Sequence, residues 1–152
     1  KPLPIIDKEI IIRSFLPGID SNDWLQLNNK VIFLTGGSRG IGYDCAKAYK
    51  RSGAKVAIAA IDKDEIDIVI AELGNEHLGI VCDVASAGSV KRAIKKVIDK
   101  SGRIDIIHNN AGIANPSCEL HETTDEEWEK LMNWLQRQIH NLFLLTQRIQ
   151  KI

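Results

Sequence analysis

Short apolar runs alternate with amphipathic stretches along residues 30–149. The runs are rich in Val and Ile and predict buried strands at 30–34, 55–61, 78–82 and 104–108. Apolar residues at helical spacing predict helices over 41–51, 66–73, 90–98 and 128–149. A capping box, Thr124 with Glu127, indicates where the last helix begins.

This alternation predicts an α/β fold, a Rossmann-type open parallel sheet with helices on both faces, because its strands are apolar on both sides. Right-handed crossovers then give the strand order 3-2-1-4. Ligands of such sheets bind at the switch point of the topology, beyond the carboxyl ends of the strands. The predicted ligand site therefore lies where strands 1 and 4 diverge.

Residues 1–25 stand apart from this pattern as an N-terminal extension. Pro2, Pro4 and Pro17 interrupt a segment that is still rich in isoleucine. The segment is too apolar for a plain disordered tail. Two interpretations remain: an extension that packs on its own domain, or an arm that covers a neighbouring subunit.

A glycine-rich turn, Thr35–Gly42, follows the first strand directly and opens the first helix. Gly36 permits a tight turn at positive φ, Gly40 lets the backbone approach a pyrophosphate, and Gly42 lets the helix sit close to the strand. The helix N-terminus offers unpaired N–H groups to the diphosphate. The alternative is a turn that serves packing alone. No Gly-Lys-Ser/Thr follows, which excludes a mononucleotide phosphate loop, so residues 26–152 are predicted to form a dinucleotide-binding domain.

Charge and cysteine content exclude several other classes. The chain has 20 Lys and Arg and 20 Asp and Glu, so its net charge does not favour nucleic acid or an anionic membrane as partner. No apolar run approaches the roughly 20 residues of a membrane span, and the N-terminus does not resemble a signal peptide. The three cysteines form no Cys-x-x-Cys pair. No metal site is therefore expected, and reduced thiols in the cytoplasm are the simplest interpretation.

Three spaced motifs carry a family resemblance. Thr35–Gly42 matches Thr-Gly-x-x-x-Gly-Ile-Gly without a gap, Asn109–Gly112 reads Asn-Asn-Ala-Gly after the fourth strand, and Asp83 follows the third strand. Over residues 25 to 132 the chain resembles the N-terminal, cofactor-binding portion of the short-chain dehydrogenase/reductase family. The resemblance implies an NAD(P)-dependent oxidoreductase that transfers hydride between nicotinamide and an alcohol or ketone substrate. It also implies a homo-oligomer.

The resemblance implies a role for each matched position. The diphosphate and the adenosine ribose would be lined by Gly36, Ser38, Arg39, Gly40 and Ile41. Adenine would be held by Asp83 and Val84, and the nicotinamide ribose would lie beside Asn110, Ala111 and Gly112. The predicted cofactor-binding set is completed by Gly42, Ile61 and Asp62. Asn109 is expected to brace the centre of the sheet, and His108 to serve packing.

The choice between NAD and NADP stays open in the sequence. An acidic residue about 20 positions after the turn binds the ribose 2′-hydroxyl of NAD, and Asp62 fits that spacing. In the family pattern, however, the acid stands where this chain has Ala60, and the basic residue of NADP enzymes stands near Ile61. Arg39 could bind a 2′-phosphate through two hydrogen bonds, but arginine there also occurs in enzymes that prefer NAD.

No catalytic residue can be assigned. The family's general acid or base is the tyrosine of Tyr-x-x-x-Lys, whose pKa the lysine lowers. The match at Tyr43 and Lys47 lies on the first helix, two strands too early, and is interpreted as coincidence. The sequence closes at Ile152, before the place where the active pair is expected.

The family's catalytic asparagine has no clear counterpart either. Its position falls on Leu135 or on Gln138, depending on the direction of counting, which implies an insertion or a join. Asn133 and Asn141 are near, but neither aligns. The chain is then either a fragment of a short-chain dehydrogenase or a complete, non-catalytic dinucleotide-binding or interaction module. A sugar epimerase fits less well, because such enzymes usually have a different glycine spacing and lack Asn-Asn-Ala-Gly.

Overall fold

The computed structural model describes residues 27–113, 121 and 123–149, and the predicted extension 1–25 lies outside these residues. Its strands are β1 (Val31–Thr35), β2 (Lys55–Ala60), β3 (Leu78–Val81) and β4 (Ile106–His108). Its helices are α2 (Gly40–Arg51), α3 (Lys63–Leu73), α4 (Ala87–Ser101) and α5 (Asp125–Ile149). The elements alternate along the chain as predicted, and the capping box before α5 is formed, with Glu127 N donating to Thr124 Oγ1 over 3.2 Å.

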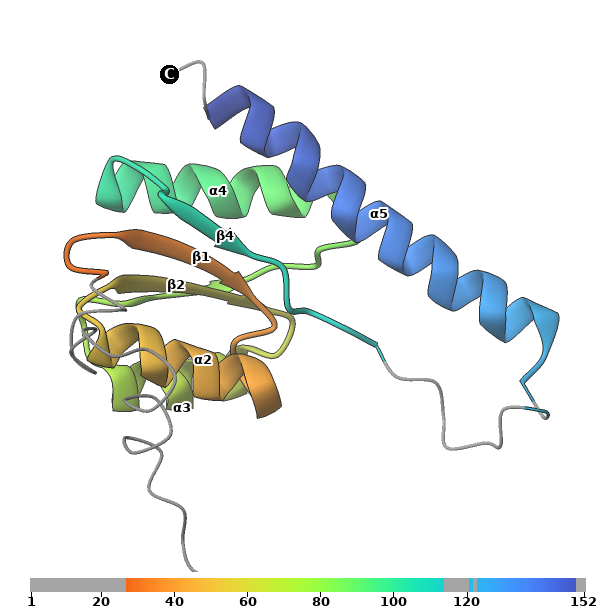
Figure 1. Ribbon diagram of the computed structural model, residues 1–152, viewed down its shortest axis with the longest axis horizontal. Coiled ribbons are helices and arrows are strands. Elements are labelled where there is room, and N and C mark those ends of the chain that lie inside the picture. Colours follow the sequence, from red (N-terminus) through yellow and green to blue (C-terminus); the bar gives the residue numbers. More distant parts are fainter. Residues whose placement is uncertain (1–26, 114–120, 122, 150–152) are drawn as a thin grey trace, which may run out of the picture.

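The four described strands form one parallel sheet in the order β3-β2-β1-β4. This confirms both the Rossmann-type fold and the predicted strand order. Figure 1 shows α2 and α3 on one side of the sheet and α4 with α5 on the other. Strand β4 is shorter than the predicted 104–108. The carboxylate of Asp105 accepts a hydrogen bond from Val31 N over 2.8 Å, so a side chain takes the place of a strand carbonyl there.

The core lies in two layers, because successive residues of a strand face opposite sides of the sheet. The layer under α4 contains Val31, Phe33, Ala57, Ala59, Ile80, Val90 and Val97. The layer under α2 and α3 contains Leu34, Val56, Ile58, Ala46, Val69 and Leu73. Both faces of β1 and β2 are therefore apolar and buried, as the continuous apolar runs predicted. This rigid centre carries the loops at the carboxyl ends of the strands.

A buried histidine ties β3 to β2. His77, 3% exposed, accepts a hydrogen bond from Val56 N at its Nδ1 atom over 3.0 Å. This bond places the ring proton on Nε2, which lies 3.3 Å from Glu76 Oε1 but makes no hydrogen bond of good geometry. Burial lowers the pKa of His77, because the charged ring would lose its hydration.

The chain is expected to lose stability in mild acid because of His77. Its pKa is lower in the folded chain than in the unfolded one, so its contribution is complete above about 6.5 and is lost as pH falls through the folded-state value. Urea unfolding between pH 5 and 7.5 should show a free energy of unfolding that decreases as the pH is lowered. His77→Asn, whose oxygen can still accept from Val56 N, should flatten this dependence, whereas replacement of the exposed His140 should not. Equal pH dependence in the two variants would contradict the assignment.

Candidate cofactor site

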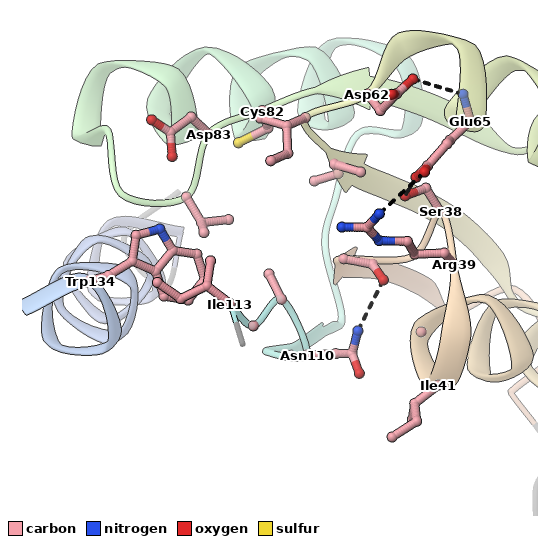
Figure 2. Close-up of a pocket in the computed structure, with 18 residues that line it drawn as sticks. Ser38, Arg39, Ile41, Asp62, Glu65, Cys82, Asp83, Asn110, Ile113 and Trp134 are labelled. Atoms are coloured by element: carbon pink, nitrogen blue, oxygen red, sulfur yellow. Dashed lines mark hydrogen bonds and ion pairs between the residues drawn. The ribbon is translucent and has the colours of Figure 1, made fainter. Parts of the chain in front are cut away.

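A cavity of about 560 Å³ lies at the carboxyl ends of the strands, between the glycine turn, α3 and the loops after β3 and β4. Twelve of the thirteen residues predicted to bind a cofactor line it: Gly36, Ser38, Arg39, Ile41, Gly42, Ile61, Asp62, Asp83, Val84, Asn110, Ala111 and Gly112. Gly40 lies on the outer side of the turn, in a neighbouring hollow. The sequence therefore located the cavity, although its lining also includes residues that were not predicted (Figure 2).

Each glycine of the turn is required for its own structural reason. Gly36 adopts φ +67°, and a Cβ there would lie 2.7 Å from the Cα of Ala111. Gly40 adopts φ +55° beside open space. A Cβ on Gly42 would lie 2.1 Å from the carbonyl oxygen of Gly36 and 2.4 Å from Asn110 Nδ2. Gly42 thus lets α2 approach the turn itself, and the positive φ at the other two lets the backbone fold back at the end of β1.

Asn110 holds the turn against the end of β4. Its Nδ2 atom donates to the carbonyl oxygens of Thr35 over 3.1 Å and of Gly36 over 3.0 Å. The backbone N–H groups of Asn110 and Ala111 both donate to Thr35 Oγ1, each over 3.1 Å. The expectation that Asn109 braces the sheet is wrong: Asn109 is exposed, and the bracing side chain is one residue further on, where the chain passes the turn.

The N-terminus of α2 has no side-chain cap. Arg39 is the capping residue, its side chain makes no capping hydrogen bond, and the first turn contains no acidic residue. The first N–H groups of a helix have no partner within the helix and carry a partial positive charge. Two residues of this first turn, Ile41 and Gly42, line the cavity. This end of α2 can therefore receive an anion such as a diphosphate.

The loop after β3 is fixed from two sides. Asp83 Oδ1 accepts from Ala85 N over 2.9 Å, which shapes the turn. Val84, 4% exposed, accepts at its carbonyl oxygen from Asn141 Nδ2 of α5 over 3.0 Å. Helix α5 therefore holds one wall of the cavity in place.

The comparisons with known proteins agree with this geometry. The family model for short chain dehydrogenase matches residues 30–150. The chain belongs to the short-chain dehydrogenase family. D-threitol dehydrogenase of Mycolicibacterium smegmatis is 34% identical over 129 residues, which are 83% of this chain and 48% of that protein. Momilactone A synthase of Oryza sativa subsp. japonica is 35% identical over 114 residues, 74% of this chain and 42% of that protein.

A solved structure is also similar. The crystal structure of 3-ketoacyl-(acyl-carrier-protein) reductase from Brucella melitensis, complexed with NADH, superposes with a TM-score of 0.70 at 30% identity. The similarity covers 80% of this chain and 49% of that one. The chain thus spans about half the length of the short-chain dehydrogenases that it matches.

Within this short-chain dehydrogenase fold, the Tyr-x-x-x-Lys match on α2 does not line the cavity of about 560 Å³. Tyr43 donates a short hydrogen bond to Glu72 of α3, and Lys47 pairs with Asp44 over 2.9 Å. The hydrogen bond to Glu72 raises the pKa of Tyr43. A general base needs the opposite shift at neutral pH, so the geometry agrees with the interpretation of this match as coincidence.

His108 has the packing role that was predicted for it. Its Nδ1 atom lies 2.9 Å from the hydroxyl oxygen of Tyr49, and the two rings meet edge to face with centroids 5.9 Å apart. Burial raises the pKa of the Tyr49 hydroxyl. The pair joins α2 to β4 below the cavity.

Two of the polar residues of α5 near the family's asparagine position, Gln138 and Asn141, are buried. Gln138 is 5% exposed and its Oε1 atom has no hydrogen-bond partner among the described residues. Asn141 is 8% exposed and holds the Val84 carbonyl. Leu135 is half-buried and Asn133 is exposed. Asn141 therefore acts as a structural residue of the cavity wall.

Six residues that line the cavity were not predicted to be part of the site: Ala59, Ala60, Glu65, Cys82, Ile113 and Trp134. Asn141 supports the cavity and was not predicted either. Glu65 lies in the first turn of α3 at the same sheet edge as the glycine turn, a signal that the sequence did contain. Trp134 and Asn141 lie far along α5, and no local pattern pointed to them.

Within the described ranges, no three His, Cys, Asp or Glu side chains converge as a metal site. No helix there is long and apolar enough to cross a membrane. Cys45 and Cys82 are free thiols, and burial raises the pKa of Cys82.

Proposed function

We propose that this chain forms the cofactor-binding half of an NAD(P)-dependent oxidoreductase that transfers hydride between nicotinamide and an alcohol or ketone. The observation that carries the proposal is the uncapped, acid-free N-terminus of α2, which faces the cavity at the switch point of the sheet. Its N–H groups would bind the diphosphate. Asp83 and Val84 would bind adenine, and Asn110, Ala111 and Gly112 would lie beside the nicotinamide ribose.

The acid–base residues of the reaction are proposed to come from outside the described residues. Neither tyrosine nor lysine occurs among the described residues that line the cavity. Strand β4 is an edge of the described sheet, and its residues are only half-buried, whereas β1 is fully buried. Further strands beside β4 would cover it. The intact mass of the native protein should therefore lie well above 16.9 kDa.

A second candidate is a non-catalytic dinucleotide-binding module, and the same lack of a lining tyrosine or lysine favours it. The two candidates differ in turnover. A panel of alcohols and ketones with NAD(H) and NADP(H) should give tyrosine-dependent turnover with the native protein under the first candidate. It should give binding without turnover under the second.

Binding of NADH to the chain is the direct test of the site. Trp134 lines the cavity, so bound NADH should accept excitation energy from it, and titration should give saturable sensitised NADH emission. Trp134→Phe should reduce this signal without abolishing it, because Trp128 lies on the same helix, and direct NADH fluorescence still reports binding. The absence of saturable binding by either readout would refute the proposed site.

The assembly and location belong to the same proposal. Helix α5 exposes Trp128 (53%), Met132 (36%) and Ile139 (59%) along one side, which is the kind of surface that a second copy of the chain would cover. Sedimentation equilibrium tests this homo-oligomer. The free thiols agree with a cytoplasmic location.

A further inference from the structure

The carboxylate of Glu65 reaches the glycine turn from helix α3. Glu65, in the first turn of α3, accepts a hydrogen bond from Ser38 Oγ at Oε2 over 2.8 Å. Its Oε1 atom lies 3.5 Å from Arg39 Nη1. Figure 2 shows the three side chains together at one side of the cavity. Glu65 is one-third exposed, so this carboxylate faces the cavity and remains accessible to a ligand.

The end of β2 offers no acid of its own. The strand ends at Ala60, and the exposed Ile61 follows it. The carboxylate of Asp62 comes next, but its Oδ1 atom caps α3, accepting from Asp64 N over 2.9 Å and from Glu65 N over 3.1 Å. A helix N-terminus can bind phosphate, and at α3 an anion of the chain already occupies that position. This end of the cavity is therefore poorly suited to an added phosphate group, unlike the N-terminus of α2.

The charges around the cavity also disfavour an added phosphate group. Among the described lining residues, Arg39 is the cation, and Asp62, Glu65 and Asp83 are carboxylates. Arg39 is itself paired with Glu65 and is 80% exposed, so its charge is partly neutralised and screened. NADP carries a 2′-phosphate with a charge of about −2 near neutral pH. NAD carries a hydroxyl there, which can donate a hydrogen bond to a carboxylate.

We propose that Glu65 takes the place of the missing acid at the end of β2, accepts a hydrogen bond from the adenosine 2′-hydroxyl, and makes this cavity select NAD(H) over NADP(H). The inference rests on the proposed function, because it assigns one end of a dinucleotide site. The Ser38 hydrogen bond fixes one carboxylate oxygen, and the other remains free for a ribose hydroxyl once the exposed Arg39 side chain moves aside. A 2′-phosphate in the same position would meet the Glu65 charge directly.

The test compares dissociation constants for NADH and NADPH, measured by nucleotide fluorescence on the chain and on Glu65→Gln. The amide keeps the size of the side chain and can still accept from Ser38, but it has no charge. We expect the unmodified chain to bind NADH at least about tenfold more tightly than NADPH, and E65Q to reduce this ratio by about tenfold, mainly through tighter NADPH binding. Asp64→Asn removes the same charge from the neighbouring residue outside the cavity lining, so it is the matched control and should leave the ratio within about twofold.

Each other outcome contradicts the inference. Equal or tighter binding of NADPH by the unmodified chain would overturn it, and so would an E65Q ratio that matches the D64N ratio. If E65Q bound both nucleotides more weakly by the same factor, Glu65 would have a purely structural role, and the inference would also be overturned. If the unmodified chain bound neither nucleotide, the proposed function would fail first, and the inference with it.

Discussion

Replacement of Ile41 by aspartate is expected to weaken NADH binding strongly without destabilising the chain. Ile41 lies in the first turn of α2, is 78% exposed and lines the cavity. An acidic residue at a helix N-terminus stabilises the helix by about 0.3–1 kcal/mol, and α2 has none there. The same carboxylate would occupy the N–H groups proposed for the diphosphate and repel its negative charge.

Ile41→Asn separates the charge from the change of shape, because asparagine has nearly the same size as aspartate but carries no charge. Fluorescence titration should give a dissociation constant for NADH at least about tenfold higher in I41D than in I41N, since repulsion between charges a few ångströms apart exceeds the 1.4 kcal/mol of one tenfold step. Thermal unfolding should show I41D to be as stable as the unmodified chain or more so. Equal affinities in I41D and I41N would mean that the diphosphate does not bind at α2.

The architecture could be predicted because its determinants are local. Apolar runs and helical spacing identify each element, and the right-handed crossover fixes the strand order once the strands are parallel. The glycine turn was equally readable, because the positive φ at Gly36 and the close packing at Gly42 are needs that glycine meets. The place of the cavity followed from these two facts, since the carboxyl ends of parallel strands meet at one edge of the sheet. Most of the predicted residues that line it were implied by the family resemblance.

The contacts between elements could not be predicted in the same way. Ser38 and Glu65 are separated by 27 positions, and their hydrogen bond depends on how α3 sits beside the turn. The two adjacent residues Asn109 and Asn110 look alike in the sequence, and only the path of the chain after β4 decides that the second one braces the turn. Asn141 reaches Val84 across 57 positions, from a helix whose rotation the apolar stripe fixes only coarsely.

These contacts between elements would determine the specificity of the site. The glycine turn and α2 would serve any dinucleotide, because they provide N–H groups and space for a diphosphate. Asn110 holds that turn in one position against β4, and Glu65 adds a charge beside Ser38 of the turn. General affinity would then come from residues that the sequence identified. Discrimination between two similar cofactors would come from one that the fold brings to the site.

Gly42→Ala is expected to destabilise the chain and to weaken NADH binding together. The alanine Cβ would lie 2.1 Å from the Gly36 carbonyl oxygen and 2.4 Å from Asn110 Nδ2. The first contact is with backbone, so the turn or α2 has to move. Such overpacking costs about 1–3 kcal/mol, which exceeds the gain of about 0.5–1 kcal/mol from replacing glycine by alanine in a helix. Urea unfolding should therefore show a net decrease in the free energy of unfolding.

Gly88→Ala is the matched control, because Gly88 also lies in the first turn of a helix, α4, but its Cβ would meet only the far end of the Arg92 side chain at 3.4 Å. This variant should gain up to about 1 kcal/mol from helix propensity and keep the NADH affinity of the unmodified chain. The two substitutions are chemically identical, so opposite signs would attribute the loss in G42A to the contact between α2 and the turn. If G42A were as stable as G88A and bound NADH equally well, the close packing of Gly42 against Gly36 would have no part in holding the site, and the turn would be free to shift without cost.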